Sequence, residues 1–134
     1  MSDTPDEDLF TRGDAVRRAV LGDAHVERSR ATADPFTADF VDFITRYAWG
    51  AVWGRDGLSR RERSIITVAL LAGLHRPEEL ALHVRGALNN GLTVEDLKEV
   101  LLHTAVYAGV PASNAAFTVA KEVLAQVAAE EQAG

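Results

Sequence analysis

The stretch LSRRERSIITVALLAGLHRPEELALHVRGALNNG, residues 58–91, decides the fold. Residues 65–72 within it are apolar on every side, which is typical of a helix surrounded by protein. Ser59 and Glu62 precede this run with the spacing of a capping box, so we expect the helix to begin there. Pro77 then opens a second helix, which the Asn-Asn-Gly triplet ends. The stretch therefore predicts two consecutive helices joined by a short turn.

Two more helices are predicted on the N-terminal side. Residues 9–21 place leucine, valine and alanine at helical spacing until Gly22 ends the helix, and we expect a loop after it. Residues 35–47 carry an aromatic stripe at three- and four-residue intervals behind Asp34, a typical N-cap, and we expect this stripe to lie mostly in the core. Three glycines punctuate residues 49–57, which predicts a turn-rich connection.

Two further helices are predicted on the C-terminal side. Thr93, with Asp96 three residues later, has the spacing of a cap, and the helix that it starts ends at Gly109. The last helix begins near residues 111–113 and frays in the Glu-rich tail. No segment shows the sustained alternation that is typical of a strand. The sequence thus predicts an all-α fold of about six helices.

Length and composition describe one folded domain. The 134 residues fit a single domain over residues 1–134, for which we expect mobile ends at 1–8 and 128–134. A hydrophobic content of 47% with 25% charged residues is typical of a folded, soluble protein. The net charge of −6 opposes binding to phosphate backbones, so nucleic acid is not an expected partner.

No apolar run reaches the length that a bilayer crossing needs. The N-terminus, MSDTPDEDLF, is acidic where a secretory signal would be basic and then apolar. We therefore expect a cytoplasmic location and no membrane partner.

Cysteine is absent, which excludes disulfides, thiolate metal sites and thiol redox chemistry. Four histidines remain as the groups that ordinarily titrate near neutral pH. General acid-base chemistry would therefore fall to these histidines or to carboxyl groups with shifted pKa values.

Two predicted helices, over residues 65–72 and 100–108, lack a clear polar face. A small helical domain cannot cover both on every side, whereas another subunit could. We therefore predict a homo-oligomer with these helices at or near the subunit contacts.

Glu79 and His83 are four residues apart and share one face of their predicted helix. A carboxylate beside an imidazole favours the charged imidazolium, which could donate a proton. The same spacing is also that of an exposed helical ion pair, and it does not distinguish between the two.

Two further charged residues in the opening stretch allow two interpretations each. Arg85 could bind a carboxylate through two parallel hydrogen bonds, or it could be an ordinary surface arginine. Glu62 could carry a proton if it is buried, or it could simply cap its helix together with Ser59.

The other three histidines have weaker signals. His103 and Tyr107 lie four apart in an almost wholly apolar segment, where a satisfied core histidine is the commoner outcome. His25 follows the first predicted helix and could lean over a pocket, whereas His75 precedes a proline and should face solvent. No histidine spacing matches a helical zinc motif, so we predict no metal site.

Five blocks in this order resemble the gamma-carboxymuconolactone decarboxylase family. They are RGDAVRRAVLGDAHV (12–26), YAWGAVWG (47–54), LSRRERS (58–64), ELALHVRGALNNG (79–91) and YAGVPASNAAF (107–117). The resemblance spans residues 12–123 and implies the helical fold of alkylhydroperoxidase D. It also implies a ring-like homo-oligomer, typically a hexamer.

The peroxidases of this superfamily carry Cys-x-x-Cys followed by histidine four residues later. Aligned on His83, the two cysteine positions hold Arg76 and Glu79. The chain therefore cannot be a thiol peroxidase.

The resemblance implies a carboxy-lyase that converts 4-carboxymuconolactone, a carboxylated lactone, to 3-oxoadipate enol-lactone in protocatechuate catabolism by the beta-ketoadipate pathway. No cofactor is required, because the substrate's conjugated ring accepts the electrons left behind by carbon dioxide. We expect His83 to donate the proton or bind the oxyanion, and Glu62 or Glu79 to tune it. Substrate contacts are expected from the following residues: Arg12, His25, Trp49, Trp53, Arg85, His103 and Tyr107. The alternative is a member with another substrate, or a non-catalytic helical oligomer.

Overall fold

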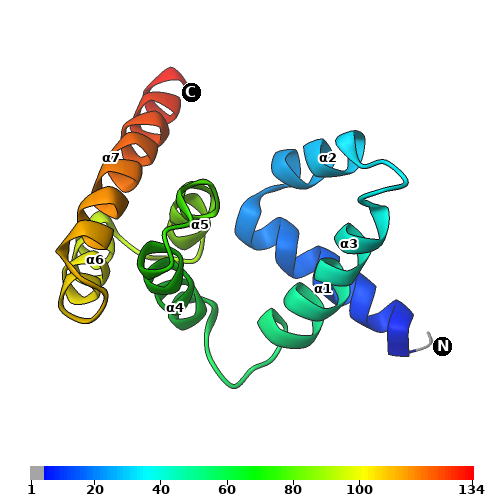
Figure 1. Ribbon diagram of the computed structural model, residues 1–134. Coiled ribbons are helices and arrows are strands. Elements are labelled where there is room, and N and C mark those ends of the chain that lie inside the picture. Colours follow the sequence, from blue (N-terminus) through cyan, green and yellow to red (C-terminus); the bar gives the residue numbers. More distant parts are fainter. Residues whose placement is uncertain (1–4) are drawn as a thin grey trace. The chain divides into compact units, whose positions relative to one another are not determined.

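The computed structural model describes residues 5–134, and every regular element in this range is helical (Figure 1). Seven α-helices and one π-helix are present there, where the sequence predicted about six helices. The elements are α1 (Pro5–Leu21), α2 (Asp23–Thr32), α3 (Ala38–Phe43), η1 (Ile44–Trp53), α4 (Arg60–Gly73), α5 (Pro77–Asn89), α6 (Val94–Ala108) and α7 (Val110–Ala133). The all-α prediction is confirmed.

Internal contacts divide the chain into two compact units. The N-terminal unit is Met1–Ser59, with α1, α2, α3 and η1, and the C-terminal unit is Arg60–Gly134, with α4 to α7. The single-domain assignment stays a prediction. Of the two ends predicted to be mobile, residues 128–133 continue α7, and part of residues 1–8 lies outside the described residues.

Helices α1 and η1 pack so closely that their backbones touch. A Cβ atom added to Gly13 would collide with the carbonyl oxygen of Thr45 and lie 2.8 Å from the amide nitrogen of Gly50. A Cβ atom on Gly50 would likewise collide with the carbonyl oxygen of Leu9. Only glycine fits at such a crossing, because any side chain would push the two helices apart.

Both tryptophans help to form the small core of the N-terminal unit. Trp49 is 6% exposed and packs with Val16 and Val20, and Trp53 packs against this cluster. The two indole rings lie 5.0 Å apart between centroids. Tryptophan fluorescence of this protein therefore reports on the N-terminal unit.

The loop predicted after Gly22 is wrong, because residues 23–32 form α2. Gly22 does end α1, with φ at 93°, but the next helix starts at once. Val26 is the one buried residue of α2, so this helix lacks the apolar stripe by which a helix is recognised in a sequence.

The turn-rich connection predicted for residues 49–57 is also wrong in its first half. Residues 44–53 form the π-helix η1, in which the Thr45 hydroxyl donates a 2.8 Å hydrogen bond to the carbonyl oxygen of Val41. Gly50 serves the contact with α1 rather than a turn. The irregular connection is confined to residues 54–59.

The aromatic stripe predicted to lie in the core is largely exposed. Phe36 is 93% exposed, Phe40 65%, Phe43 57% and Tyr47 43%. The opposite face of the α3–η1 stretch is the buried one, through Thr45 and Trp49. The periodicity located the helix correctly, but it does not identify what covers the apolar face.

In the C-terminal unit, α4 packs against α5 and α6, and α7 packs against α4, α5 and α6. The core combines residues from all four helices and from the α5–α6 turn: Val68, Ala72, Leu80, Val84, Ala87, Leu92, Leu97, Leu101, Ala116, Ala120 and Val123. The predicted cap of α6 is confirmed, since Thr93 and Asp96 exchange hydrogen bonds of 3.1 and 2.8 Å.

His75 closes α4 in a left-handed conformation, with φ at 56°. Its amide donates to the carbonyl oxygen of Ala72, and the amide of Arg76 donates to that of Leu71, which is the Schellman pattern. The side chain is exposed, as predicted. Glycine is the residue usually found at this position, because it has no Cβ atom to strain.

Replacing His75 with glycine should raise the free energy of unfolding by about 1 kcal/mol, since the left-handed strain disappears. Chemical denaturation followed by circular dichroism would measure the change. His75→Ala is the matched control and should bring no gain, because alanine keeps the strain. Equal stabilisation by both variants would contradict this account of the turn.

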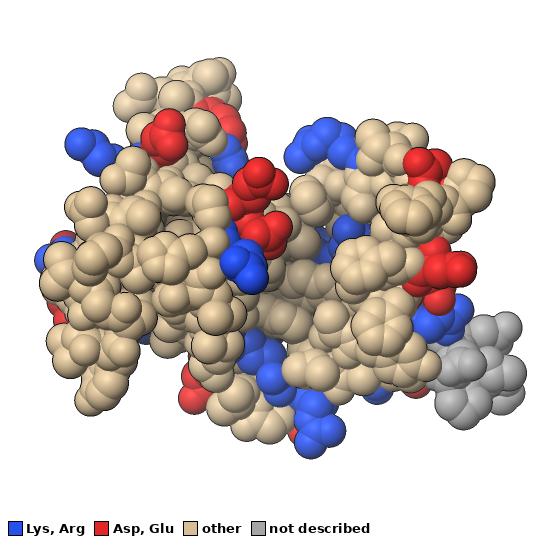
Figure 2. Space-filling model, in the orientation of Figure 1, with Lys and Arg blue, Asp and Glu red and all other residues tan. Residues whose placement is uncertain are grey.

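Several large apolar side chains of the C-terminal unit are exposed. They include Ile66, Leu70, Leu74, Leu102, Val106, Tyr107 and Val110. Figure 2 shows that uncharged side chains cover most of the surface over α6 on the face in view.

Among residues 5–134, no helix combines the length and apolar character that a membrane crossing requires.

Candidate active site

Arg12 of α1 lies beside a hollow of about 520 Å³ in the N-terminal unit. Its Nε donates a 3.2 Å hydrogen bond to the carbonyl oxygen of Gly50, which fixes the side chain against η1. Arg55 and Asp56 line the same hollow. Two guanidinium groups and one carboxylate leave a net positive site, which suits an anionic group of a ligand.

Trp49 and Trp53 were predicted to contact substrate. Trp49 is buried against Val16 and Val20, and this packing holds α1 on η1. Trp53 is partly buried and stacks on Trp49 with an interplanar angle of 32°. This packing gives both tryptophans a structural role. That either of them contacts the substrate stays a prediction, and the partly buried Trp53 is the more accessible of the two.

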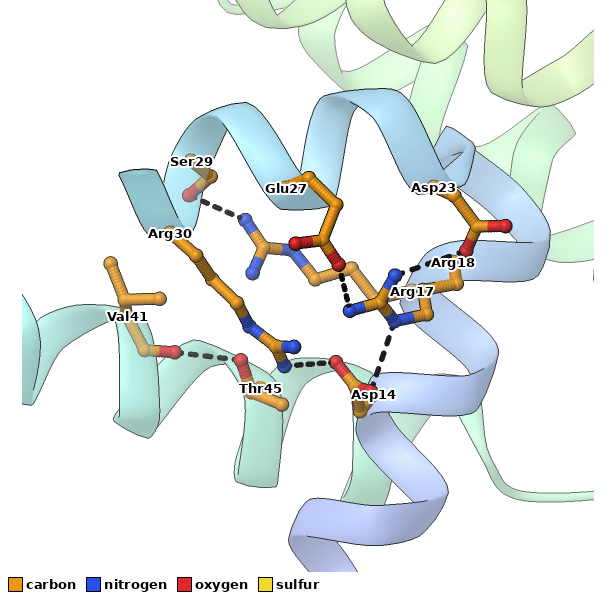
Figure 3. A network of polar contacts seen from close by, with 9 residues as sticks. All are labelled: Asp14, Arg17, Arg18, Asp23, Glu27, Ser29, Arg30, Val41 and Thr45. Carbon is orange, nitrogen blue, oxygen red and sulfur yellow. Dashed lines mark hydrogen bonds and ion pairs between the residues drawn. The ribbon is translucent and has the colours of Figure 1, made fainter. Parts of the chain in front are cut away.

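A polar network joins α1 to α2 (Figure 3). Arg18 binds three carboxylates, those of Asp14, Asp23 and Glu27, at 3.1, 3.1 and 2.6 Å. Arg30 of α2 pairs with the other carboxylate oxygen of Asp14. These ion pairs tie α2, which has one buried residue, to α1.

His25, a predicted substrate contact, lies on α2 and is partly buried. Burial lowers its pKa, and the positive charges of Arg17 and Arg28 lower the pKa further. The neutral imidazole is therefore favoured in the folded protein at neutral pH. Arg17, which lowers this pKa more than Arg28 does, was not singled out from the sequence.

The N-terminal unit should lose stability as the pH falls through the range just below His25's ordinary pKa of about 6.5. In that range the unfolded chain binds a proton at His25 and the folded chain does not, so folding becomes less favourable. Urea midpoints read by tryptophan fluorescence at several pH values would measure the slope. His25→Gln should flatten it, and an unchanged slope in that variant would contradict the assignment.

In the C-terminal unit, α5 carries His83 and Glu79, and the first turn of α4 carries Glu62. The His83 ring is partly buried with its Nδ1 atom inside the protein, whereas Glu79 and Glu62 are exposed. His83 does not line the hollow at Arg12, the hollow at Arg76 or the hollow between α6 and α7. The His83 ring is thus partly shielded from solvent, but it lies outside these three hollows.

Arg85 is bound by α7. Its two terminal nitrogens donate to the two carboxylate oxygens of Glu130 at 3.0 and 2.7 Å, and one also donates to Gln126 at 3.4 Å. Glu130 raises the pKa of Arg85. A substrate carboxylate would have to displace Glu130, so the predicted clamp role is less favoured here than at Arg12.

His103 and Tyr107 stack along α6, with ring centroids 5.0 Å apart. Both side chains are exposed, and Tyr107 is 80% so. The interpretation of His103 as a core histidine is therefore wrong. Its neighbours in the sequence are apolar, but they belong to the uncovered face of this helix.

The structure also places some residues in surroundings that the sequence did not predict. A second hollow, of about 280 Å³, lies between the end of α4, the start of α5 and α7, and His75 and Arg76 contribute to it among apolar side chains. Arg55 joins Arg12, and Arg17 lies close to His25. Arg17 had a signal in the sequence, since it lies three residues before Val20 and so shares a face of the helix with an apolar residue. The structure shows that both are buried.

The carboxymuconolactone decarboxylase family model matches residues 38–122. A 4-carboxymuconolactone decarboxylase of Acinetobacter baylyi is 50% identical over 118 residues, which are 88% of each chain. A nitrosuccinic acid decarboxylase of Metarhizium robertsii is 44% identical over 116 residues, 87% of this chain and 81% of that protein. A 4-carboxymuconolactone decarboxylase sequence of Pseudomonas putida is 49% identical over 41 residues, 31% of this chain and 85% of that sequence.

The match to the family model covers more than half of the chain and runs from α3 into α7. The resemblance noted in the sequence implied a helical fold, and the described residues form one. This chain belongs to the carboxymuconolactone decarboxylase family.

Proposed function

We propose that this protein decarboxylates 4-carboxymuconolactone to 3-oxoadipate enol-lactone without a cofactor. The observation that carries the proposal is the 50% identity, over 88% of both chains, to a protein of that name. The chain also offers a cationic hollow and a partly buried histidine, both of which suit this reaction.

The reaction needs little from the protein besides charge stabilisation. The departing carboxylate and an acetate arm are attached to the same ring carbon. When carbon dioxide leaves, the electron pair of the broken bond spreads through the ring double bond onto the lactone carbonyl oxygen. A proton then adds to the ring carbon next to that carbonyl, which gives the enol-lactone. A hydrogen-bond donor at the oxyanion lowers this barrier.

His83 is the proposed donor, because its ring is partly buried and its Nδ1 atom lies inside the protein. Glu79 shares its helix face and is the proposed tuning group, with Glu62 as the alternative. Arg12 and Arg55 are the proposed clamp for a substrate carboxylate, since they line one hollow. Substrate contacts by His103 and Tyr107 stay predictions.

Oligomer formation belongs to this proposal. One chain leaves a large apolar surface uncovered, on α4, on α6 and along the aromatic stripe of α3–η1. A homo-oligomer would bury this surface at its subunit contacts. A ring-like hexamer is the proposed form, and sedimentation velocity at micromolar concentration tests it. A stable monomer would end the idea.

The activity is tested by following 4-carboxymuconolactone spectrophotometrically with purified protein and no added metal or nucleotide. We expect turnover that a chelator does not reduce. The nitrosuccinic acid decarboxylase relative favours a second candidate substrate, nitrosuccinic acid, which is assayed in parallel. Turnover of that compound alone would replace the proposed specificity, and turnover of neither would favour a non-catalytic member. If 4-carboxymuconolactone is turned over, the proposed role of the protein is in protocatechuate catabolism in the cytoplasm.

A further inference from the structure

Arg17 is a buried cation with most of its hydrogen-bonding capacity unused. Arg17 is 3% exposed, and its Nη2 atom donates a 3.1 Å hydrogen bond to the hydroxyl of Ser29. The Nε and Nη1 atoms are buried and have no hydrogen-bond partner. A guanidinium has five N–H groups in a planar fork. Nη2 donates one of its two hydrogens to Ser29, and its other hydrogen can act together with that of Nε, or with one of Nη1, to bind a carboxylate.

The charges around Arg17 make this arrangement costly. The groups that act on it most are Arg30, Asp14 and Arg18, two of which are also cations. The carboxylate of Asp14 is already bound by Arg18 and Arg30, as Figure 3 shows. Burial and the charge of Arg30 lower the pKa of Arg17. Asp14 raises the pKa of Arg17 but is hydrogen-bonded to Arg18 and Arg30 instead. A buried charge without a hydrogen-bonded counter-ion destabilises a fold, so an anion bound directly by Arg17 would be stabilising.

Helix α2 can admit such an anion. It covers this part of α1 and contributes one buried residue, Val26. Besides the hydrogen bond from Arg17 to Ser29, α2 is tied to α1 by ion pairs, and those of Arg18 reach exposed carboxylates on Asp23 and Glu27. Such pairs contribute little individually, so lifting α2 costs less than opening an apolar interface.

The candidate ligands share one chemical unit. In 4-carboxymuconolactone the carbon that loses carbon dioxide carries a carboxylate and a CH2–COO⁻ arm, and that unit is a succinate skeleton. Nitrosuccinic acid, in the name of the second relative, contains the same skeleton with a nitro group on it. The electron-accepting group differs between the two compounds, whereas the pair of carboxylates does not.

We propose that Arg17 binds a carboxylate of a substituted succinate between α1 and α2, and that α2 closes over it. The assignment rests on the proposed function for its ligand class and on the buried guanidinium for its place. It makes Arg17 a substrate-binding residue in addition to Arg12.

The direct test is nuclear magnetic resonance of the arginine Nε–H groups in the wild-type protein, with succinate as the probe. The Arg17 signal, assigned by its loss in Arg17→Lys, should shift on titration with succinate, and the His25 ring signals should show a raised pKa at saturation. Hydrogen exchange of α2 amides should slow. An Arg17 signal that does not move at saturating succinate would overturn the proposal.

Variants separate this arginine from general charge effects. Arg17→Gln should weaken succinate binding by roughly 30-fold or more, as expected when one partner of a buried charged pair is removed. Arg28→Gln removes an exposed positive charge of α2 and should change binding less than threefold. Arg17→Lys, which keeps the charge, replaces Arg17→Gln if the latter fails to fold, and it should still bind more weakly because lysine lacks the planar fork.

Failure of this proposal is distinguishable from failure of the proposed function. If 4-carboxymuconolactone is turned over and Arg17 does not respond to succinate, the function stands and the Arg17 site is wrong. If Arg17 responds to succinate and neither lactone nor nitrosuccinic acid is consumed, the site stands and the function is wrong.

Discussion

Replacing His83 with alanine should reduce the turnover of 4-carboxymuconolactone by roughly 10²-fold or more, because the oxyanion on the lactone would lose its donor. The effect should fall on kcat more than on KM, since the oxyanion exists only after carbon dioxide has begun to leave. Steady-state kinetics on protein with an unchanged circular dichroism spectrum would measure both constants.

His75→Asn is the matched control for this substitution. It removes the exposed histidine at the end of α4, and asparagine tolerates the left-handed backbone found there. Its rate should stay within about threefold of the wild-type rate, because the His75 ring is exposed and is not among the residues proposed to bind or protonate the substrate. A His83→Ala protein with near-normal kcat would remove this histidine from the mechanism, whatever the control shows.

Replacing Gly13 with alanine should destabilise the N-terminal unit by about 3 kcal/mol or more. The new methyl group would collide with backbone atoms of Thr45 and Gly50, which cannot rotate away as a side chain can. Urea unfolding read by tryptophan fluorescence measures the loss, since both tryptophans lie in this unit.

The control for Gly13→Ala is Gly57→Ala. No atom lies within 4 Å of the position that a Cβ would take at Gly57, and its backbone does not need a positive φ. This variant should unfold within about 0.5 kcal/mol of the wild type, as a change in open space does. Equal losses in the two variants would show that the close crossing of α1 and η1 is not the cause.

Local signals in the sequence predicted the helix ends well. Thr93 with Asp96, Pro77 and Gly22 each mark an end that the structure confirms, because a cap needs only residues a few positions away. The two elements that were missed depend on distant groups. Helix α2 is held by ion pairs to α1, and η1 is shaped against the backbone of α1.

In the candidate site, too, contacts between residues close in the sequence were predictable and contacts between distant residues were not. Neighbours four residues apart on one helix, such as His103 and Tyr107, were predicted to be adjacent and are. The partner of Arg85 was not predictable, because Glu130 lies 45 residues further along the chain. Nor does periodicity say which apolar face remains uncovered, as the exposed phenylalanines of α3 show. Family membership supplied the ligand class, and the packing supplied Arg17.

The attachment of α2 by ion pairs makes one half of this protein sensitive to ionic strength. At 1 M salt the Debye length shrinks to about 3 Å, so the exposed contacts of Arg18 with Asp23 and Glu27 should be screened. The core of α4 to α7 is apolar and should not weaken under these conditions. A halophilic or osmotically stressed environment would thus loosen the covering of Arg17 while leaving the remaining helices intact.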